Sequence, residues 1–315
     1  MRPPTLLDAA VTNARPEMPV RGGRTSATLF AMDEGDASGV KRYFDELGEK
    51  EWDRLEIDLR SRVSLEMHRR FLRRWVLPGK RVLEVGAGPG RFTIELARLG
   101  CRVVASDISG VQLDLNKRHV ADASLSDQVE SWRCLDVRDM SELATWSFDA
   151  VVAYGGPLSY VFEDVPRALA ECLRVVAPGG PVVASVMSLP GSARFFLESF
   201  PPTIRAVGLE TFERFLNVGD QRMIEAAGAH ACQMFSWADV QDIARGVGAE
   251  VLGATASNWL SLGSAAALEM LAAEATWWEH FLDWEESLSS QAGAIDGGTH
   301  LLFAVCRRDR RRQQV

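Results

Sequence analysis

A glycine-rich turn at residues 86–90 is the part of the sequence best suited to hold a ligand. Residues 82–93 read VLEVGAGPGRFT, an apolar strand followed by the turn and then by a helix. Glycine lets the backbone turn tightly and leaves room for a ligand to lie against it. A dinucleotide fingerprint, GxGxxG, needs a third glycine where Arg91 stands, whereas Gly86, Gly88 and Gly90 follow the spacing GxGxG. The turn therefore disfavours a bound pyrophosphate.

An acidic residue, Asp107, ends the next apolar run, residues 103–106. A carboxylate at the end of this strand can accept hydrogen bonds from both hydroxyls of a ribose. Dinucleotide-binding enzymes use the same solution, so Asp107 predicts an adenosine ribose rather than one particular cofactor. Ser109 follows as the expected cap of the next helix.

The GxGxG turn preceded by Glu84 resembles motif I of the class I S-adenosylmethionine-dependent methyltransferases. Three further segments resemble later landmarks of that family in the same order: CLDVRDM at 134–140, FDAVVAY at 148–154 and RVVAPGG at 174–180. The resemblance covers about residues 43–307 and is tightest over 82–187. It implies a small-molecule enzyme that uses S-adenosylmethionine as its cofactor.

The resemblance also implies the site. The turn would receive the methionine portion of the cofactor, and an acidic residue at 134–140 would face the adenine amine, for which we choose Asp136 over Asp139. The residues expected to bind the cofactor are Glu84, Gly86, Ala87, Gly88, Gly90, Asp107, Ile108, Asp136, Val137 and Tyr154.

Alternating apolar runs and helical patterns surround this turn. Apolar runs with the character of parallel strands fall at 81–85, 102–106, 129–135, 149–154 and 181–187, with later strands at 250–256 and 300–306. Helices are predicted at 91–99, 110–121 and 165–176, the last capped by Asp164 with Pro166 in its first turn. A helix at 237–247 has Ser236 and Asp239 spaced as a capping box. The series predicts an α/β fold, a Rossmann-like doubly wound sheet, and the resemblance implies seven strands with the last antiparallel.

Three domain segments follow from the pattern. Residues 1–39, rich in Pro, Gly, Arg and Ser, predict a flexible leader, and residues 40–78 predict an N-terminal cap of two helices. Residues 79–315 form the predicted methyltransferase domain with insertions at 189–235 and 262–292. Both insertions follow strand ends on the cofactor edge, where they would close an acceptor pocket. A long helical segment at 265–288 carries aromatic residues on a wide apolar face, which indicates helix packing or an aromatic wall for a substrate.

The composition restricts the acceptor. A formal net charge of −8 disfavours nucleic-acid binding, because that binding needs cations to neutralise phosphates. After strand four the chain reads YGGPLSY, without the Asn or Asp followed by Pro-Pro of amino-methylating DNA enzymes, and Glu163 stands alone where protein arginine methyltransferases have paired glutamates. These absences favour a small-molecule acceptor and leave O, N and C open as the methylated atom.

A proton acceptor is needed only if the acceptor must lose a proton, since the sulfonium methyl is already activated. Candidates near the expected pocket are His230, Tyr160 and His300, with His230 favoured because the first insertion must return to the sheet there. The five scattered cysteines suggest neither a metal site nor disulfides, and no apolar run predicts a signal peptide or a membrane span. A cytoplasmic protein is expected, and the oligomeric state stays open.

Two other functions remain. One is an enzyme of the same fold that binds S-adenosylmethionine and catalyses a different step, such as a cyclisation. The other is a non-catalytic partner protein, against which the presence of both Glu84 and Asp107 argues. A natural product or secondary metabolite is one acceptor class that fits a small-molecule enzyme.

Overall fold

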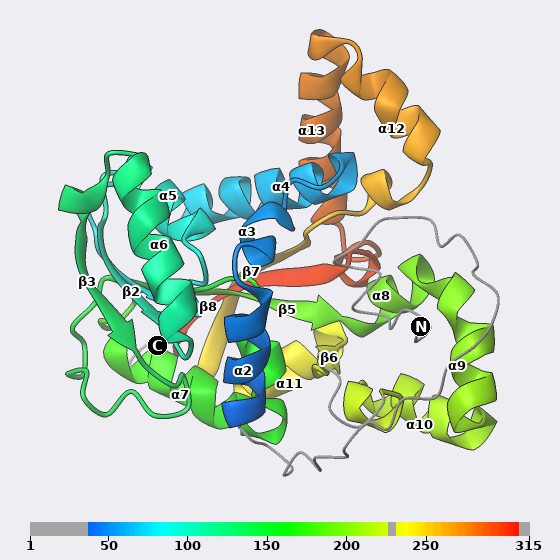
Figure 1. Ribbon diagram of the computed structural model, residues 1–315, viewed down its shortest axis with the longest axis horizontal. Coiled ribbons are helices and arrows are strands. Elements are labelled where there is room, and N and C mark those ends of the chain that lie inside the picture. The colour runs from blue at the N-terminus through cyan, green and yellow to red at the C-terminus, as the bar shows by residue number, and fades with distance from the viewer. Residues whose placement is uncertain (1–36, 226–230, 309–315) are drawn as a thin grey trace, which may run out of the picture.

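A largely parallel sheet forms the centre of the chain, whose computed structural model describes residues 37–225 and 231–308 (Figure 1). The strands run in the order β3-β2-β1-β4-β5-β8-β7. Their bounds are β1 (Arg81–Val85), β2 (Arg102–Asp107), β3 (Val129–Cys134), β4 (Ala150–Ala153), β5 (Val182–Ser188), β7 (Ala249–Ala256) and β8 (His300–Arg307). β8 is antiparallel to both β5 and β7, and the other pairs along this path are parallel.

The predicted doubly wound sheet with an antiparallel last strand is confirmed. A short additional strand, β6 (Met234–Phe235), pairs with the end of β5. It was not predicted, because two residues are too few to show a strand period.

Alternate residues of each strand face opposite helical layers. Leu83 and Val85 pack with helices α7 (Val165–Val175) and α11 (Trp237–Gly246), whereas Val82 packs with the layer on the other face. That second layer consists of α4 (Leu59–Trp75), α5 (Arg91–Arg98) and α6 (Gly110–Asp122). Nearly every residue of β1, β4 and β5 is buried, because side chains that alternate between the two faces meet a helical layer on each.

The N-terminal region contains three helices rather than the predicted two. α2 (Ala37–Leu47) ends before Gly48, whose φ of 54° stops the helix, and α3 (Lys50–Asp53) is a single turn. α4 then begins after Asp58, whose side chain accepts a hydrogen bond from the Ser61 backbone N–H. The break at Gly48 has a local cause, since glycine adopts positive φ without steric cost.

Most of the predicted helix caps are present. Ser109 caps α6, and Ser236 with Asp239 forms a complete capping box on α11. Asp164 stands at the N-cap position of α7 as predicted, but its side chain makes no capping hydrogen bond. The 3-10 turn η3 (Phe162–Asp164) runs directly into α7, so Asp164 has a near-helical backbone and its carboxylate lies 3.3 Å from Arg138 instead.

The first insertion forms a lobe beside the sheet. It contains α8 (Leu189–Phe195), α9 (Phe200–Val207) and α10 (Leu209–Val218), the helices at the right of Figure 1. Phe196, Phe212 and Phe215 of this lobe pack with Met187 at the end of β5 and with Tyr160. The lobe therefore has an aromatic core of its own that meets the sheet at the carboxyl end of its strands.

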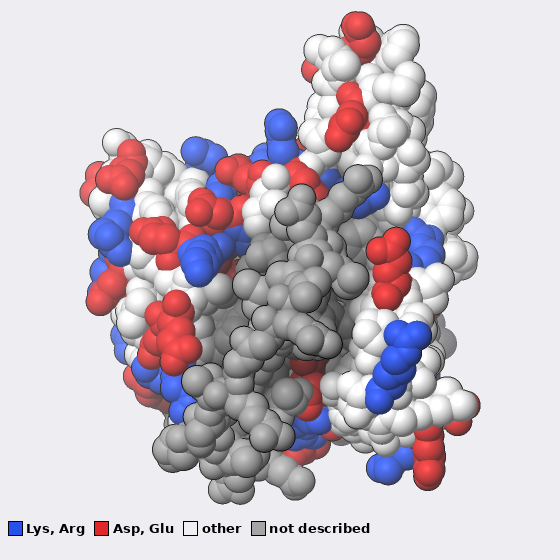
Figure 2. Space-filling view, turned by 45° about the vertical axis from the view of Figure 1, so that its right-hand side comes forward, with Lys and Arg blue, Asp and Glu red and all other residues white. Residues whose placement is uncertain are grey.

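The second insertion projects from the body as an arm of two helices, α12 (Ala265–Ala272) and α13 (Ala275–Ser289) (Figure 1). The helical segment predicted at 265–288 is divided into these two helices, because the chain folds back and Leu268 and Phe281 pack together with Val63 and Met67 of α4. Buried Glu285 anchors the base of the arm by accepting the backbone N–H groups of the η6 turn (Leu260–Leu262) and its preceding residue. On the face shown in Figure 2, acidic and basic side chains are interspersed.

Candidate functional site

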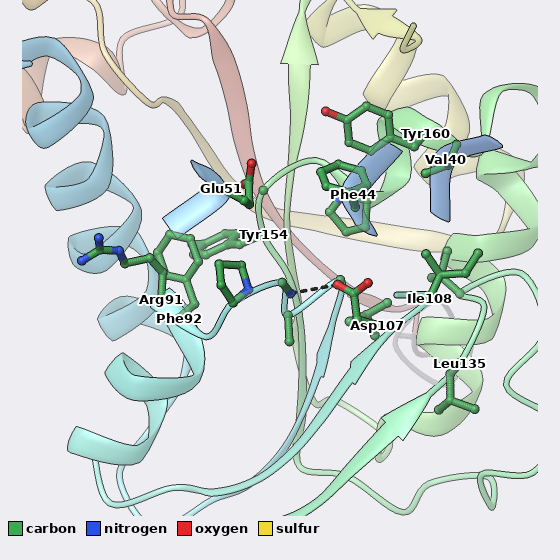
Figure 3. A pocket seen from close by; sticks show the side chains of 18 of the residues that line it. Val40, Phe44, Glu51, Arg91, Phe92, Asp107, Ile108, Leu135, Tyr154 and Tyr160 are labelled. Atoms are coloured by element: carbon green, nitrogen blue, oxygen red, sulfur yellow. Dashed lines mark hydrogen bonds between the residues drawn. The ribbon is translucent and has the colours of Figure 1, made fainter. Parts of the chain in front are cut away.

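A pocket lies where β1 to β4 end at the carboxyl edge of the sheet (Figure 3). Its floor consists of the glycine turn and the residues that follow β2 and β3, and α2 and α3 cover it from the other side. The lining includes these residues predicted to bind the cofactor: Gly86, Ala87, Gly88, Asp107, Ile108, Asp136, Val137 and Tyr154. Parallel strands bring their carboxyl ends to one edge, which explains why residues from four strands meet here.

The glycine turn needs its glycines for two different reasons. Gly86, Gly88 and Gly90 all have positive φ. A Cβ atom on Gly86 would lie 2.7 Å from the Cβ of Pro157, and one on Gly90 would lie 3.0 Å from the Cγ of Asn116. The turn is therefore held between two neighbouring segments, while Gly90, absent from the pocket lining, begins helix α5.

Asp107 holds the turn and the start of α6 at once. Its Oδ2 accepts the Gly88 N–H at 2.8 Å, drawn as a dashed line in Figure 3, and its Oδ1 accepts the Ser109 N–H at 2.8 Å. The side chain is buried, and burial raises the pKa of Asp107 to about 6. Each carboxylate oxygen has a second lone pair, so the group can still accept from ligand hydroxyls.

Glu84 lies behind the turn, because it is absent from the pocket lining and is 2% exposed. Its Oε2 accepts from the Thr93 hydroxyl at 2.5 Å, and the Thr93 hydroxyl also accepts from the Asn116 amide at 2.8 Å. Burial raises the pKa of Glu84 to about 8, and the nearby Asp107 adds to this shift. Glu84 is thus linked to the turn indirectly, through Thr93 and through Asn116, whose amide also donates to the Gly88 carbonyl.

Of the two carboxylates considered for the adenine end, Asp136 lines the pocket and Asp139 does not. Arg138 binds Asp136 through Nη2 at 2.7 Å and also meets Asp164. Burial acts to raise the pKa of Asp136, but hydrogen bonds from Arg138 outweigh it, so the pKa lies below its usual value. Asp136 is therefore an ionised acceptor at neutral pH.

The upper wall of the pocket comes from residues that the sequence patterns did not single out. Val40 and Phe44 of α2, with Glu51, Arg54 and Leu55 of the α3 region, line it. Arg54 binds Glu51 with two nitrogens, at 2.7 Å through Nη2 and 3.0 Å through Nε. The three-residue spacing of these two opposite charges is visible in the sequence, but a spacing of this kind is common on helix surfaces and does not by itself indicate a pocket.

Aromatic rings form another part of the pocket wall. Tyr160 follows β4 on the 3-10 turn η2 (Pro157–Tyr160), and its ring meets Phe44 edge-to-face at 5.4 Å. Tyr154 packs against Phe92 at 4.9 Å and donates its hydroxyl to the His68 carbonyl at 3.4 Å. The pocket thus has acidic side chains at Asp107 and Asp136 and an aromatic end at Phe44 and Tyr160, with the Glu51–Arg54 pair also in its lining.

The three proton acceptors considered in the sequence have different surroundings. Burial raises the pKa of Tyr160 well above its usual value of 10, so its phenol stays protonated at neutral pH. Burial lowers the pKa of His300 well below 6.5, and His300 lies at the start of β8 beside His68, outside the pocket lining. His230 lies outside the described residues. Within residues 37–225 and 231–308, no cluster of His, Cys, Asp and Glu could hold a metal ion, and no helix is long and apolar enough to cross a membrane.

Comparisons with known proteins agree with this geometry. Residues 82–180 match the family model described as a methyltransferase domain. A ubiquinone biosynthesis O-methyltransferase of Hahella chejuensis is 30% identical over 158 residues, which cover 49% of this chain and 62% of that protein. The chain therefore spans less than two thirds of this curated relative.

Two solved structures share the fold. Magnesium protoporphyrin IX methyltransferase from Synechocystis, solved with bound S-adenosylhomocysteine, has a TM-score of 0.56 at 14% identity and covers 87% of this chain and all of its own. A 4+2 cyclase has a TM-score of 0.53 at 15% identity, covering 85% of this chain and 95% of its own.

The sheet order and the glycine turn agree with the match of residues 82–180 to a methyltransferase domain.

Proposed function

We propose that the chain transfers a methyl group from S-adenosylmethionine to a small-molecule acceptor. The observation that carries this proposal is the single pocket in which the GxGxG turn, Asp107 and Asp136 meet. The methyl group on the sulfonium is already activated, which is the chemistry that the cofactor supplies. The protein's part is then to bind, to orient and to exclude water.

Each end of the pocket suits a different part of the cofactor. Asp107 can accept the ribose hydroxyls, and Asp136 with the backbone near Val137 can receive the adenine. Gly86 to Gly88 leave space for the methionine portion, and Arg54 lines the pocket with a cation suited to a carboxylate. Glu84 and Gly90 support the turn without lining the pocket.

The acceptor belongs at the aromatic end. Phe44 and Tyr160 meet there, beside the lobe with its cluster of phenylalanines. An apolar or aromatic molecule fits such a wall better than a phosphate chain does. The curated relative named above is called an O-methyltransferase, which favours oxygen as the acceptor atom, and a secondary metabolite is one acceptor class of this kind.

The proton acceptor, if the reaction uses one, is proposed among the three residues weighed in the sequence. Of the two that lie among the described residues, Tyr160 lines the pocket and His300 does not, and the raised pKa of Tyr160 suits donation of a hydrogen bond to the acceptor better than removal of a proton. His230 stays a prediction. If it is the base, His230→Ala lowers turnover by about 10²- to 10⁴-fold with unchanged cofactor affinity.

The test is acceptor-dependent release of S-adenosylhomocysteine. Purified protein would be incubated with S-adenosylmethionine and a panel of phenols, carboxylic acids and amines, and the products analysed by mass spectrometry. We expect a methylated acceptor and an equal amount of S-adenosylhomocysteine.

The second candidate function is a cyclisation or another step that leaves the cofactor unchanged. The observation that favours it is the fold likeness to a 4+2 cyclase. A converted acceptor without release of S-adenosylhomocysteine would establish this candidate and contradict methyl transfer. Binding of S-adenosylmethionine with no conversion across a broad panel would favour a non-catalytic role.

A further inference from the structure

Helix α6 carries a stripe of three polar residues that face the protein interior. Ser109, Gln112 and Asn116 are spaced three and four residues apart, at the cap and on one face of the helix, and each is 0% exposed. Polar side chains are rarely buried so completely unless hydrogen bonds hold them. The three residues bond to α2 on one side and to the glycine turn on the other, so the stripe connects parts of the candidate site that are separate in the sequence.

Two members of the stripe hold helix α2. Gln112 donates its amide to the Phe44 carbonyl at 2.7 Å and to the Gly48 carbonyl at 3.3 Å, which caps the carboxyl end of α2. The Ser109 hydroxyl donates to Asp45 Oδ1 at 2.5 Å. The Gln112 Oε1 atom is buried and has no hydrogen-bond partner among the described residues, so the side chain is placed for its donor alone.

The same stripe reaches the pocket floor. The Ser109 backbone N–H donates to Asp107, and the Asn116 amide donates to the Gly88 carbonyl at 3.2 Å. Figure 3 shows Val40 and Phe44 of α2 on one side of the pocket, with Asp107 and Ile108 on the other. A ligand at Asp107 therefore lies beneath α2.

Hydrogen bonds from α6 and the contact of Phe44 with Tyr160 attach α2 to the rest of the chain. The four apolar clusters of the described residues include residues of α4, α5 and α6 but none of α2. An element with few fully buried apolar residues opens at low free-energy cost. Hydrogen bonds that hold such an element closed therefore contribute to how often it opens.

We propose that Gln112 is a positioning residue that holds α2 closed over the cofactor and thereby sets the rate at which cofactor and product leave. The hydrogen bond from Ser109, at the amino end of α6, to Asp45 of α2 assists it. This inference rests on the proposed function, because it requires that the pocket bind the cofactor.

The experiment measures dissociation of S-adenosylhomocysteine by stopped-flow displacement. Gln112→Met keeps the length of the side chain and removes both donors. Gln221→Met is the matched control, because Gln221 is also 0% exposed and its amide bonds within the first insertion, to Glu225 and to the Cys232 N–H. Both variants should lose thermal stability, but only Gln112→Met should release the ligand faster, by about tenfold for the two lost hydrogen bonds.

Asp45→Ala tests the same attachment from a half-buried position that does not risk the core. It should speed release by about threefold. Hydrogen exchange at residues 44–48 should rise in both Gln112→Met and Asp45→Ala. Release at the wild-type rate in Gln112→Met and Asp45→Ala, or an equal increase in Gln221→Met, would overturn the proposal. Failure of the wild-type chain to bind S-adenosylhomocysteine would instead contradict the proposed function on which this inference rests.

Discussion

The cofactor side of the pocket and the two insertions are built in different ways. On the cofactor side, short segments after successive parallel strands supply the lining, and Asp107 reaches Gly88 across only 19 residues. In the second insertion, Glu285 bonds the Trp259 N–H, and α13 is tied to α4 by Arg70 with Asp283, 213 residues away. Local sequence motifs therefore predict the cofactor side, whereas the insertions depend on long-range packing that no motif predicts.

The largest effect should come from damage to the arm that leaves the cofactor side intact. Glu285→Ala removes a 0% exposed carboxylate that accepts three backbone N–H groups and the Ser289 hydroxyl. Several buried donors then lack partners, so we expect the free energy of unfolding to fall by about 3 kcal/mol. Thermal denaturation would measure it, with exposed Glu274→Ala as the control.

The same Glu285→Ala variant should bind S-adenosylhomocysteine with wild-type affinity below its melting temperature. A matching loss of affinity would show that the arm and the cofactor side are one energetic unit, and the distinction between the two regions would be lost.

The second effect concerns cofactor affinity. Asp107→Ala removes the acceptor predicted for the ribose hydroxyls, so binding should weaken by about 1 to 3 kcal/mol. Because Asp107 also accepts the Gly88 and Ser109 N–H groups, some thermal stability should be lost as well. Calorimetry would compare it with Asp139→Ala, a neighbouring carboxylate outside the pocket lining, which should bind normally. Equal affinities in the two variants would remove Asp107 from the site.

The third effect is a change in pH dependence on the cofactor side. Burial raises the pKa of Glu84 to about 8, from a usual value of 4.5. A raised carboxyl pKa means that the folded state holds the proton more tightly than the unfolded state does. The stability that protonated Glu84 contributes is therefore fully present below pH 4.5 and is lost as pH rises towards 8. Glu84→Gln mimics the protonated form, so its stability should exceed that of the wild type by on the order of 2 kcal/mol at pH 8 and match it near pH 5.

Chemical denaturation at several pH values would measure this difference. Burial also raises the pKa of Asp107, to about 6, so in both proteins Asp107 makes the free energy of unfolding depend on pH mainly below pH 6.5. The comparison between pH 6.5 and 8 therefore isolates Glu84. A variant with the wild-type slope over that range would contradict the burial argument.

The smallest effect is expected at the aromatic end. Tyr160→Phe keeps the ring that meets Phe44 and removes a hydroxyl whose raised pKa disfavours proton removal. Once an acceptor is known, turnover should fall by less than about tenfold. A loss of a hundredfold or more, with unchanged cofactor affinity, would make Tyr160 the proton acceptor after all.

The parallel half of the fold could be predicted because buried strands appear as continuous apolar runs in the sequence. The class of ligand could be narrowed because the glycine spacing of the turn disfavours a pyrophosphate. Of the two carboxylates weighed for the adenine, Asp136 lies in the pocket lining and Asp139 does not. The break between α12 and α13 was missed because periodicity continues across it, and the helix folds back only to reach Val63 and Met67.

Other features were missed because their cause lies in tertiary structure. Phe44 and Arg54 reach the pocket from helices whose packing no motif describes. The sequence predicted that Glu84 binds the cofactor, but its carboxyl accepts a hydrogen bond from the Thr93 hydroxyl, outside the pocket lining. One usable signal was overlooked: Ser109, Gln112 and Asn116 follow Asp107 at helical spacing, where a core-facing helix would normally carry apolar residues.

The central claim is that the pocket of the glycine turn and Asp107 binds S-adenosylmethionine, and a calorimetric titration tests it most directly. Wild-type protein would be titrated with S-adenosylmethionine, with S-adenosylhomocysteine and with NAD under the same conditions. We expect both sulfur compounds to bind with one site per chain, competitively with each other, and NAD to give no binding heat. Binding of NAD, or the absence of binding by both sulfur compounds, would contradict the claim.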